Sequence, residues 1–159
     1  MAIQTIAVSI SGGNASLITA KYAIYLAKQL QSKLCVIYVV DEKSLHELLK
    51  SRIFVEIEEV EYEHDLKNQG KISLERITKM AEAKGVVCEP LLLEGVIHDE
   101  VVNKTRELVA DLLVIGDLKE VLSAREVFYD EGERIFRESP CPVVVVKNPL
   151  EVERLYKAL

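Results

Sequence analysis

Basic residues are the minority charge in this 159-residue chain, because 20 Lys and Arg stand against 26 Asp and Glu and the net charge is −6. This shortage argues against broad electrostatic binding to nucleic acid or to an anionic membrane, although a nucleotide needs only a few local donors. No apolar run approaches the roughly 20 residues of a membrane span. No basic region precedes an apolar one at the N-terminus, so we expect no signal peptide and a cytoplasmic location.

Cysteine and histidine are also scarce, and their spacing excludes the common metal and disulfide motifs. The three cysteines, Cys35, Cys88 and Cys141, form no CxxC pair and no zinc spacing, which favours free thiols in a reducing cytosol. The three histidines are scattered and show no HxxxH spacing. We therefore expect no metal site.

The apolar residues, at 49% of the chain, are enough for one globular domain, and they gather in short runs rich in β-branched residues. Such runs predict buried strands at 3–10, 34–40, 86–93, 110–116 and 140–146. Helical spacing predicts helices at 17–31 and 96–109, and a tail helix at 150–159 that is amphipathic and exposed enough to dock a partner. The inward positions of the second helix are Ile97, Val101, Val102, Thr105, Leu108 and Val109.

Alternation of strands and helices predicts an α/β, doubly wound three-layer sandwich around a five-stranded parallel sheet of order 3-2-1-4-5. This order places the third strand, which contains Pro90, at an edge. We expect the domain to span residues 1–148, with 149–159 as a separate tail helix.

Two stretches are harder to read. Residues 44–50 are typical of a short helix, and 53–62 fits either a strand or the start of a long helix; continued helical spacing to Lys84 favours the helix. Gly70 predicts a break or bend inside it, and Gly85 a helix end. The segment 117–139 is expected to be mostly helical.

The sheet order places a switch point between the first and fourth strands, where ligands bind in such sheets. The strand ends there are 9–14 and 116–119. In the first of these loops Asn14 and Ser16 are candidate N-caps for the helix that follows.

Two motifs carry a resemblance to a known family. Residues 111–116 read Asp-Leu-Leu-Val-Ile-Gly and residues 141–146 read Cys-Pro-Val-Val-Val-Val, with Glu-Arg-Ile at 133–135 upstream. Together these resemble a universal stress protein domain of the UspA-like type over nearly the whole chain. The resemblance implies the fold known as adenine nucleotide alpha hydrolase-like.

Some members of that family bind ATP through a signature resembling Gly-x-x-Gly, nine residues, then Gly-Ser or Gly-Thr. Its first glycine matches Gly116, but the second falls on Lys119 and the final pair on Tyr129 and Asp130. Glycines there let backbone N–H groups approach phosphates, whereas Asp130 adds like charge. The family's adenine-binding Asp falls on Ser11. These departures favour a family member that binds neither ATP nor another cofactor.

Other readings of the same residues are weaker. The loop Ser11–Ser16 is similar to the Ser-Gly-Gly-x-Asp-Ser pyrophosphatase loop of ATP-dependent amidating enzymes, but Ala15 replaces the Asp. No GxSxG nucleophile elbow is present. The acidic run 56–65 reads as a solvated helix face or a partner surface.

The fifth strand is apolar yet lies at an edge, which is a liability unless something pairs with it. The resemblance implies a homodimer in which Val143, Val144, Val145 and Val146 pair with their twins. We expect a stress-response regulatory or interaction module, not an enzyme. The alternative is a nucleotide sensor or weak ATPase whose pocket is formed by Ser9, Ile10, Ser11, Gly12, Gly13, Val39, Gly116, Lys119, Tyr129 and Asp130.

Overall fold

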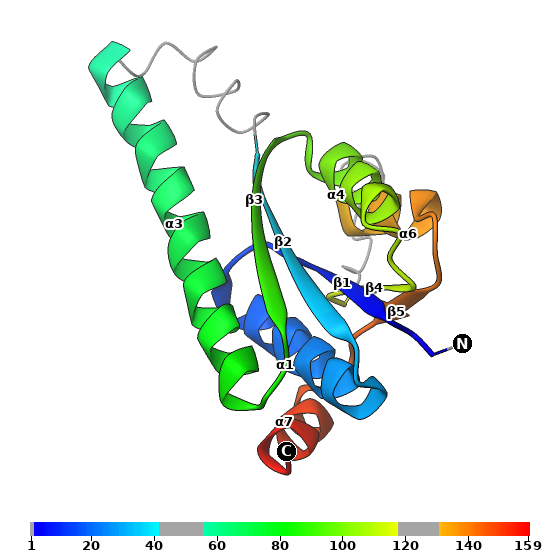
Figure 1. Cartoon of the computed structure of the whole chain (residues 1–159). Helices are drawn as coiled ribbons and strands as arrows, with labels where there is room; N and C mark the ends of the chain where they lie inside the picture. Colours follow the sequence, from blue (N-terminus) through cyan, green and yellow to red (C-terminus); the bar gives the residue numbers. More distant parts are fainter. Residues whose placement is uncertain (1, 42–55, 118–130) are drawn as a thin grey trace.

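A computed structural model describes residues 2–41, 56–117 and 131–159, and it contains one five-stranded parallel sheet of order β3-β2-β1-β4-β5 (Figure 1). The strands are β1 Thr5–Ile10, β2 Lys33–Asp41, β3 Cys88–Gly95, β4 Leu112–Ile115 and β5 Val143–Val145. The predicted sheet and its order are confirmed. The expected helix at 44–50 and the first part of the helical segment 117–139 lie outside the described residues.

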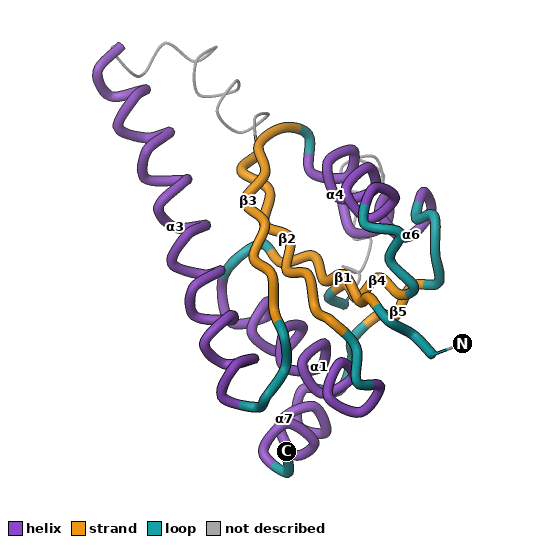
Figure 2. Tube along the Cα trace, viewed as in Figure 1, coloured by secondary structure: helices purple, strands orange, loops and turns teal. Residues whose placement is uncertain are grey.

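Helices cover both faces of the sheet (Figure 2). One face carries α1 Gly13–Leu30, α3 Glu56–Ala83 and α7 Pro149–Lys157, and the other carries α4 Ile97–Glu107 and α6 Glu131–Glu138. Each face has its own core, because alternate residues of a strand point to opposite sides. In β1, Ile6 and Val8 face the α1 side while Ala7 faces the α4 side, and all three are fully buried.

β3 is an edge strand, as Pro90 predicts. The carbonyl of Val87 accepts the N–H of Leu34 on β2. Alternation then directs the backbone groups of Glu89 toward β2 and those of Pro90 away from it. The missing N–H of Pro90 therefore costs the sheet no hydrogen bond.

The stretch that fits a strand or a helix is helical from residue 56, as favoured, and its first turns project beyond the sheet (Figure 1). The predicted break at Gly70 is wrong, because α3 runs through it. Gly70 is buried where α3 crosses the sheet, and a Cβ there would lie 2.7 Å from Leu92 Cδ1 and 2.9 Å from Tyr38 Cδ1. The glycine allows a close approach instead of a bend. Gly85 has a φ of +75° just after α3, which confirms the predicted end.

Two local predictions for other helices are also wrong. α1 begins at Gly13 with Gly12 as its N-cap, so neither Asn14 nor Ser16 takes that position. Val109, which was predicted to face the core from the helix 96–109, is instead 80% exposed with a φ of +50°. The reason is that α4 already ends at Glu107, so Val109 lies in the turn after the helix.

The tail helix α7 packs against α1. Val152 is 2% exposed within the core on that face. Lys21 on α1 binds Glu153 at 2.5 Å, and the ammonium groups of Lys21 and Lys84 lie 5.4 and 4.9 Å from the ring centre of Tyr156. Asn148 caps the helix by accepting the N–H of Glu151. One side of the tail helix, which was expected to be exposed enough to dock a partner, is therefore buried against the chain's own core.

Candidate functional site

The carboxyl end of β1 turns into α1 through two glycines in left-handed conformations. Gly12 and Gly13 have φ values of +83° and +81°, which side chains rarely adopt. The N–H of Ser11 donates to Ser16 Oγ at 2.9 Å, and the two hydroxyl oxygens lie 3.4 Å apart. Ser16 is buried in the first helical turn of α1, and its side chain therefore stabilises the loop between β1 and α1.

Gly116 follows β4 and lies beside the same turn. β1 and β4 are parallel, with Val8 opposite Val114, so the residues that follow each strand leave the same edge of the sheet. A Cβ on Gly116 would lie 3.0 Å from Thr19 Oγ1 on α1. The fold therefore brings the ends of β1 and β4 together at the switch point, as the sheet order predicts.

A cavity of about 100 Å³ opens at this turn, on the α1 and α3 side of the sheet. Its lining comes from the turn, from α1 and from α3: Ile10, Gly12, Gly13, Asn14, Ser16, Leu17, Ser73, Arg76 and Ile77. Ligand pockets for small organic molecules are typically about 300–1,000 Å³. The volume enclosed by these described residues is enough for a few waters or a small anion.

The candidate pocket residues separate onto the two faces of the sheet. Ile10, Gly12 and Gly13 line the cavity, whereas Val39 packs with Ile115 in the core under α4. Ser9 follows Val8 and by strand alternation faces the same side as Val39. Lys119, Tyr129 and Asp130 lie outside the described residues.

Sequence reasoning missed the contribution of α3. Ser73, Arg76 and Ile77 have the i, i+3, i+4 spacing of one helix face, which was visible in the sequence. The spacing does not show which strand end that face meets. Tyr38 lies between the turn and α3, with its hydroxyl 3.7 Å from a Cβ placed on Gly12. Burial raises the pKa of Tyr38, so this phenol stays neutral near neutral pH.

A family model described as the universal stress protein family matches residues 2–147. The chain belongs to this family. The family match ends just before α7 begins at Pro149.

Other universal stress proteins support the assignment. The chain is 34% identical to universal stress protein MJ0531 of Methanocaldococcus jannaschii, over 92% of this chain and 83% of that protein. Universal stress protein UspA from Lactobacillus plantarum has the same fold, with a TM-score of 0.73 at 16% identity over 92% of this chain and 99% of that chain.

A third relative was solved with a ligand. It is a universal stress protein in complex with cAMP, with a TM-score of 0.67 at 21% identity over 92% of this chain and 98% of that chain.

Among the residues that the structure describes, this universal stress protein has no helix with the length and apolar character of a membrane span.

Proposed function

We propose that this universal stress protein is a dimeric regulatory or interaction module of the cytosol that works without ATP and without catalysis. The observation that carries the proposal is the chemistry at the ATP signature, where Lys119, Tyr129 and Asp130 stand at the positions of small residues. A phosphate chain needs closely approaching backbone N–H groups. A carboxylate at contact distance in a partly buried site repels it by a few kcal/mol.

Two features of the described residues agree with this proposal. Ser11 stands where the family resemblance expects an Asp, and its backbone N–H already donates to Ser16. All three cysteines are free thiols, which supports a reducing compartment.

Calorimetric titration with ATP and Mg²⁺ tests the proposal. We expect no measurable heat for the wild-type chain and restored binding for the Tyr129→Gly, Asp130→Ser double variant, because the substitutions remove bulk and like charge. Tight binding by the wild-type chain would overturn the proposal. A double variant that binds no better than wild type would also contradict it, since the signature would then not be what excludes ATP.

The second candidate function is nucleotide sensing, and one specific observation favours it. The cavity combines a guanidinium on Arg76 with hydroxyls on Ser73 and Ser16, which suit a single phosphate group. A relative of the same fold was solved with cAMP. Titration with cAMP, AMP and inorganic phosphate separates the candidates: binding that Arg76→Gln weakens supports sensing, and no binding supports the first proposal.

A further inference from the structure

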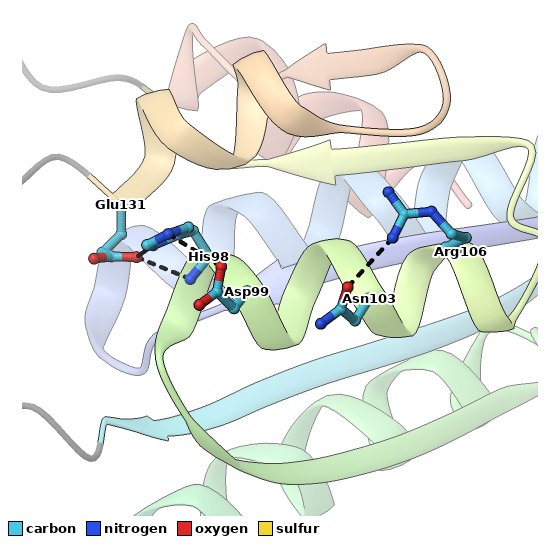
Figure 3. A network of polar contacts seen from close by, with 5 residues as sticks. All are labelled: His98, Asp99, Asn103, Arg106 and Glu131. Carbon is cyan, nitrogen blue, oxygen red and sulfur yellow. Dashed lines mark hydrogen bonds and ion pairs between the residues drawn. The ribbon is translucent and has the colours of Figure 1, made fainter.

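The start of α4 is joined to the start of α6 by a histidine and a carboxylate. The backbone N–H of His98 donates to Glu131 Oε2 at 2.8 Å, and ring atom Nδ1 of His98 lies 2.6 Å from the same oxygen (Figure 3). A carboxylate oxygen only accepts hydrogen bonds, so Nδ1 carries the proton of this contact. The His98 side chain is 12% exposed, and the contact of Nδ1 with Glu131 orients its ring.

The other ring nitrogen, Nε2, lies near one acidic oxygen. It lies 3.3 Å from Asp99 Oδ1. Ligand atoms of His98, Asp99 and Glu138 all lie within 4.8 Å of one another, and Glu138 comes from the opposite end of α6. In the neutral ring with the proton on Nδ1, Nε2 carries a lone pair. This lone pair repels the carboxylate oxygen 3.3 Å away, and a cation between the two atoms removes that repulsion.

The distances fit a small divalent metal ion. In a tetrahedral zinc site with bonds of about 2.0–2.2 Å, neighbouring ligand atoms are about 3.3–3.6 Å apart. The separation of Nε2 and Asp99 Oδ1 already has this value. Glu138 is exposed, so its side chain can move by the roughly 1 Å that is still needed.

We propose that His98, Asp99 and Glu138 bind one divalent cation of the zinc class, with Glu131 as a positioning residue. A carboxylate on the far nitrogen of a metal-binding histidine fixes its tautomer and raises its basicity, and Glu131 has this place. An imidazole ligand favours zinc over magnesium or calcium, which prefer all-oxygen sites. Bound metal offsets the charge of three carboxylates and ties α4 to both ends of α6.

This site is separate from the cavity at the α1 turn, because α4 and α6 cover the opposite face of the sheet. Sequence spacing indicates no metal site, since the participating residues lie at positions 98, 99, 131 and 138 in no known motif. Only the packing of α4 against α6 brings them together.

Calorimetry of the full chain with ZnCl₂, with Co²⁺ absorption as a second readout, tests the proposal. We expect one site per chain, loss of binding in His98→Asn, at least about tenfold weaker binding in Glu138→Gln, and about 10–100-fold weaker binding in Glu131→Gln. Zinc should also raise the melting temperature of the wild-type chain. Glu138→Gln alters an exposed side chain, so it keeps the test valid if His98→Asn folds poorly.

Two control variants address other zinc ligands in the chain. His64 is an exposed histidine on α3, and Cys141 is a free thiol, so His64→Asn and Cys141→Ser should bind zinc as the wild type does. Loss of binding in either control would overturn the site. So would unchanged binding in His98→Asn, or the absence of both heat and a cobalt spectrum in the wild-type chain.

Discussion

Asp111 shows how one carboxylate joins distant segments. It opens the Asp-Leu-Leu-Val-Ile-Gly motif, and its Oδ2 accepts the backbone N–H groups of Gln4 and Thr5 at 2.9 and 3.0 Å. The N–H of Asp111 in turn donates to the carbonyl of Thr5. The residue therefore aligns the entry of β4 with the entry of β1, which gives a physical reason for an acid at this position of the motif.

The charge on Asp111 should make this contact depend on pH. Hydrogen bonds from Thr5 and then Gln4 lower the pKa of Asp111 below its ordinary value. A lowered pKa in the folded state gives stability that is present above the unfolded-state pKa of about 3.9 and is lost as the pH falls through the folded-state pKa. We expect Asp111→Asn to melt below the wild type at pH 7, and the gap to close below about pH 4.

Melting curves between neutral and acid pH measure this difference. Asp65→Asn, which changes an exposed acid on α3, is the matched control and should follow the wild type at each pH. A melting gap for Asp111→Asn that stays constant with pH would show that the charge of Asp111 is not what stabilises the contact.

At the scale of elements, α7 has two sides with different environments. Val152 is 2% exposed against α1, while Leu150, two residues earlier, is 85% exposed. The ring of Tyr156 contacts the ammonium groups of Lys21 and Lys84, and these cation–π contacts favour the docked helix. Apolar contacts of Val152 and cation–π contacts of Tyr156 therefore hold α7 against the rest of the domain.

Substitutions on the two sides of α7 should differ in their effect on stability. We expect Val152→Ala to lower the free energy of unfolding by about 2 kcal/mol, through lost apolar burial and a residual cavity. Leu150→Ala should change it by less than about 0.5 kcal/mol, because the side chain is in solvent. Urea denaturation measures both, and equal effects would contradict the docking of α7 on α1.

At the scale of the whole molecule, β5 presents one free edge. The carbonyl of Pro142 accepts the N–H of Leu113, and the N–H of Val146 donates to the carbonyl of Ile115. Alternation therefore directs the backbone groups of Val143 and Val145 away from β4. An apolar edge of this kind favours pairing with a second chain, which supports the proposed homodimer.

A proline at this edge tests the homodimer without removing a bond inside the sheet. The N–H of Val145 points away from β4, so Val145→Pro should leave the ladder in place and block pairing with a second chain. We expect sedimentation equilibrium to show a dimer for the wild type and for Leu150→Ala, and a monomer for Val145→Pro. A monomeric wild type, or a Val145→Pro variant that stays dimeric, would contradict pairing through β5.

Local predictions succeeded where neighbouring residues decide the outcome. Runs of β-branched residues predicted five strands, and Pro90 predicted the edge, because an absent N–H is a property of the residue itself. The break predicted at Gly70 was wrong because the role of this glycine depends on residues far away in the sequence. Helix propensity disfavours glycine, but the packing of α3 over Tyr38 and Leu92 requires one.

Candidate sites were harder to predict than strands, because their residues come from separate elements. The glycine turn after β1 was visible in the sequence, while the contribution of Arg76 and Ser73 from α3 was not. The His98 and Glu131 contact joins residues 33 positions apart.

Periodicity and punctuating residues were sufficient to predict the α/β fold, and two motifs carried the resemblance to the universal stress protein family, since both depend on patterns within short segments. The strand order was predicted with the help of Pro90, which favours an edge. Only the tertiary structure decided which faces of α3, α4 and α6 meet the sheet and one another. Those contacts set the size of the cavity at the α1 turn and form the cluster around His98, and the burial of α7 depends in the same way on its packing against α1. Long-range packing brings together side chains whose spacing along the chain carries no signal of their proximity.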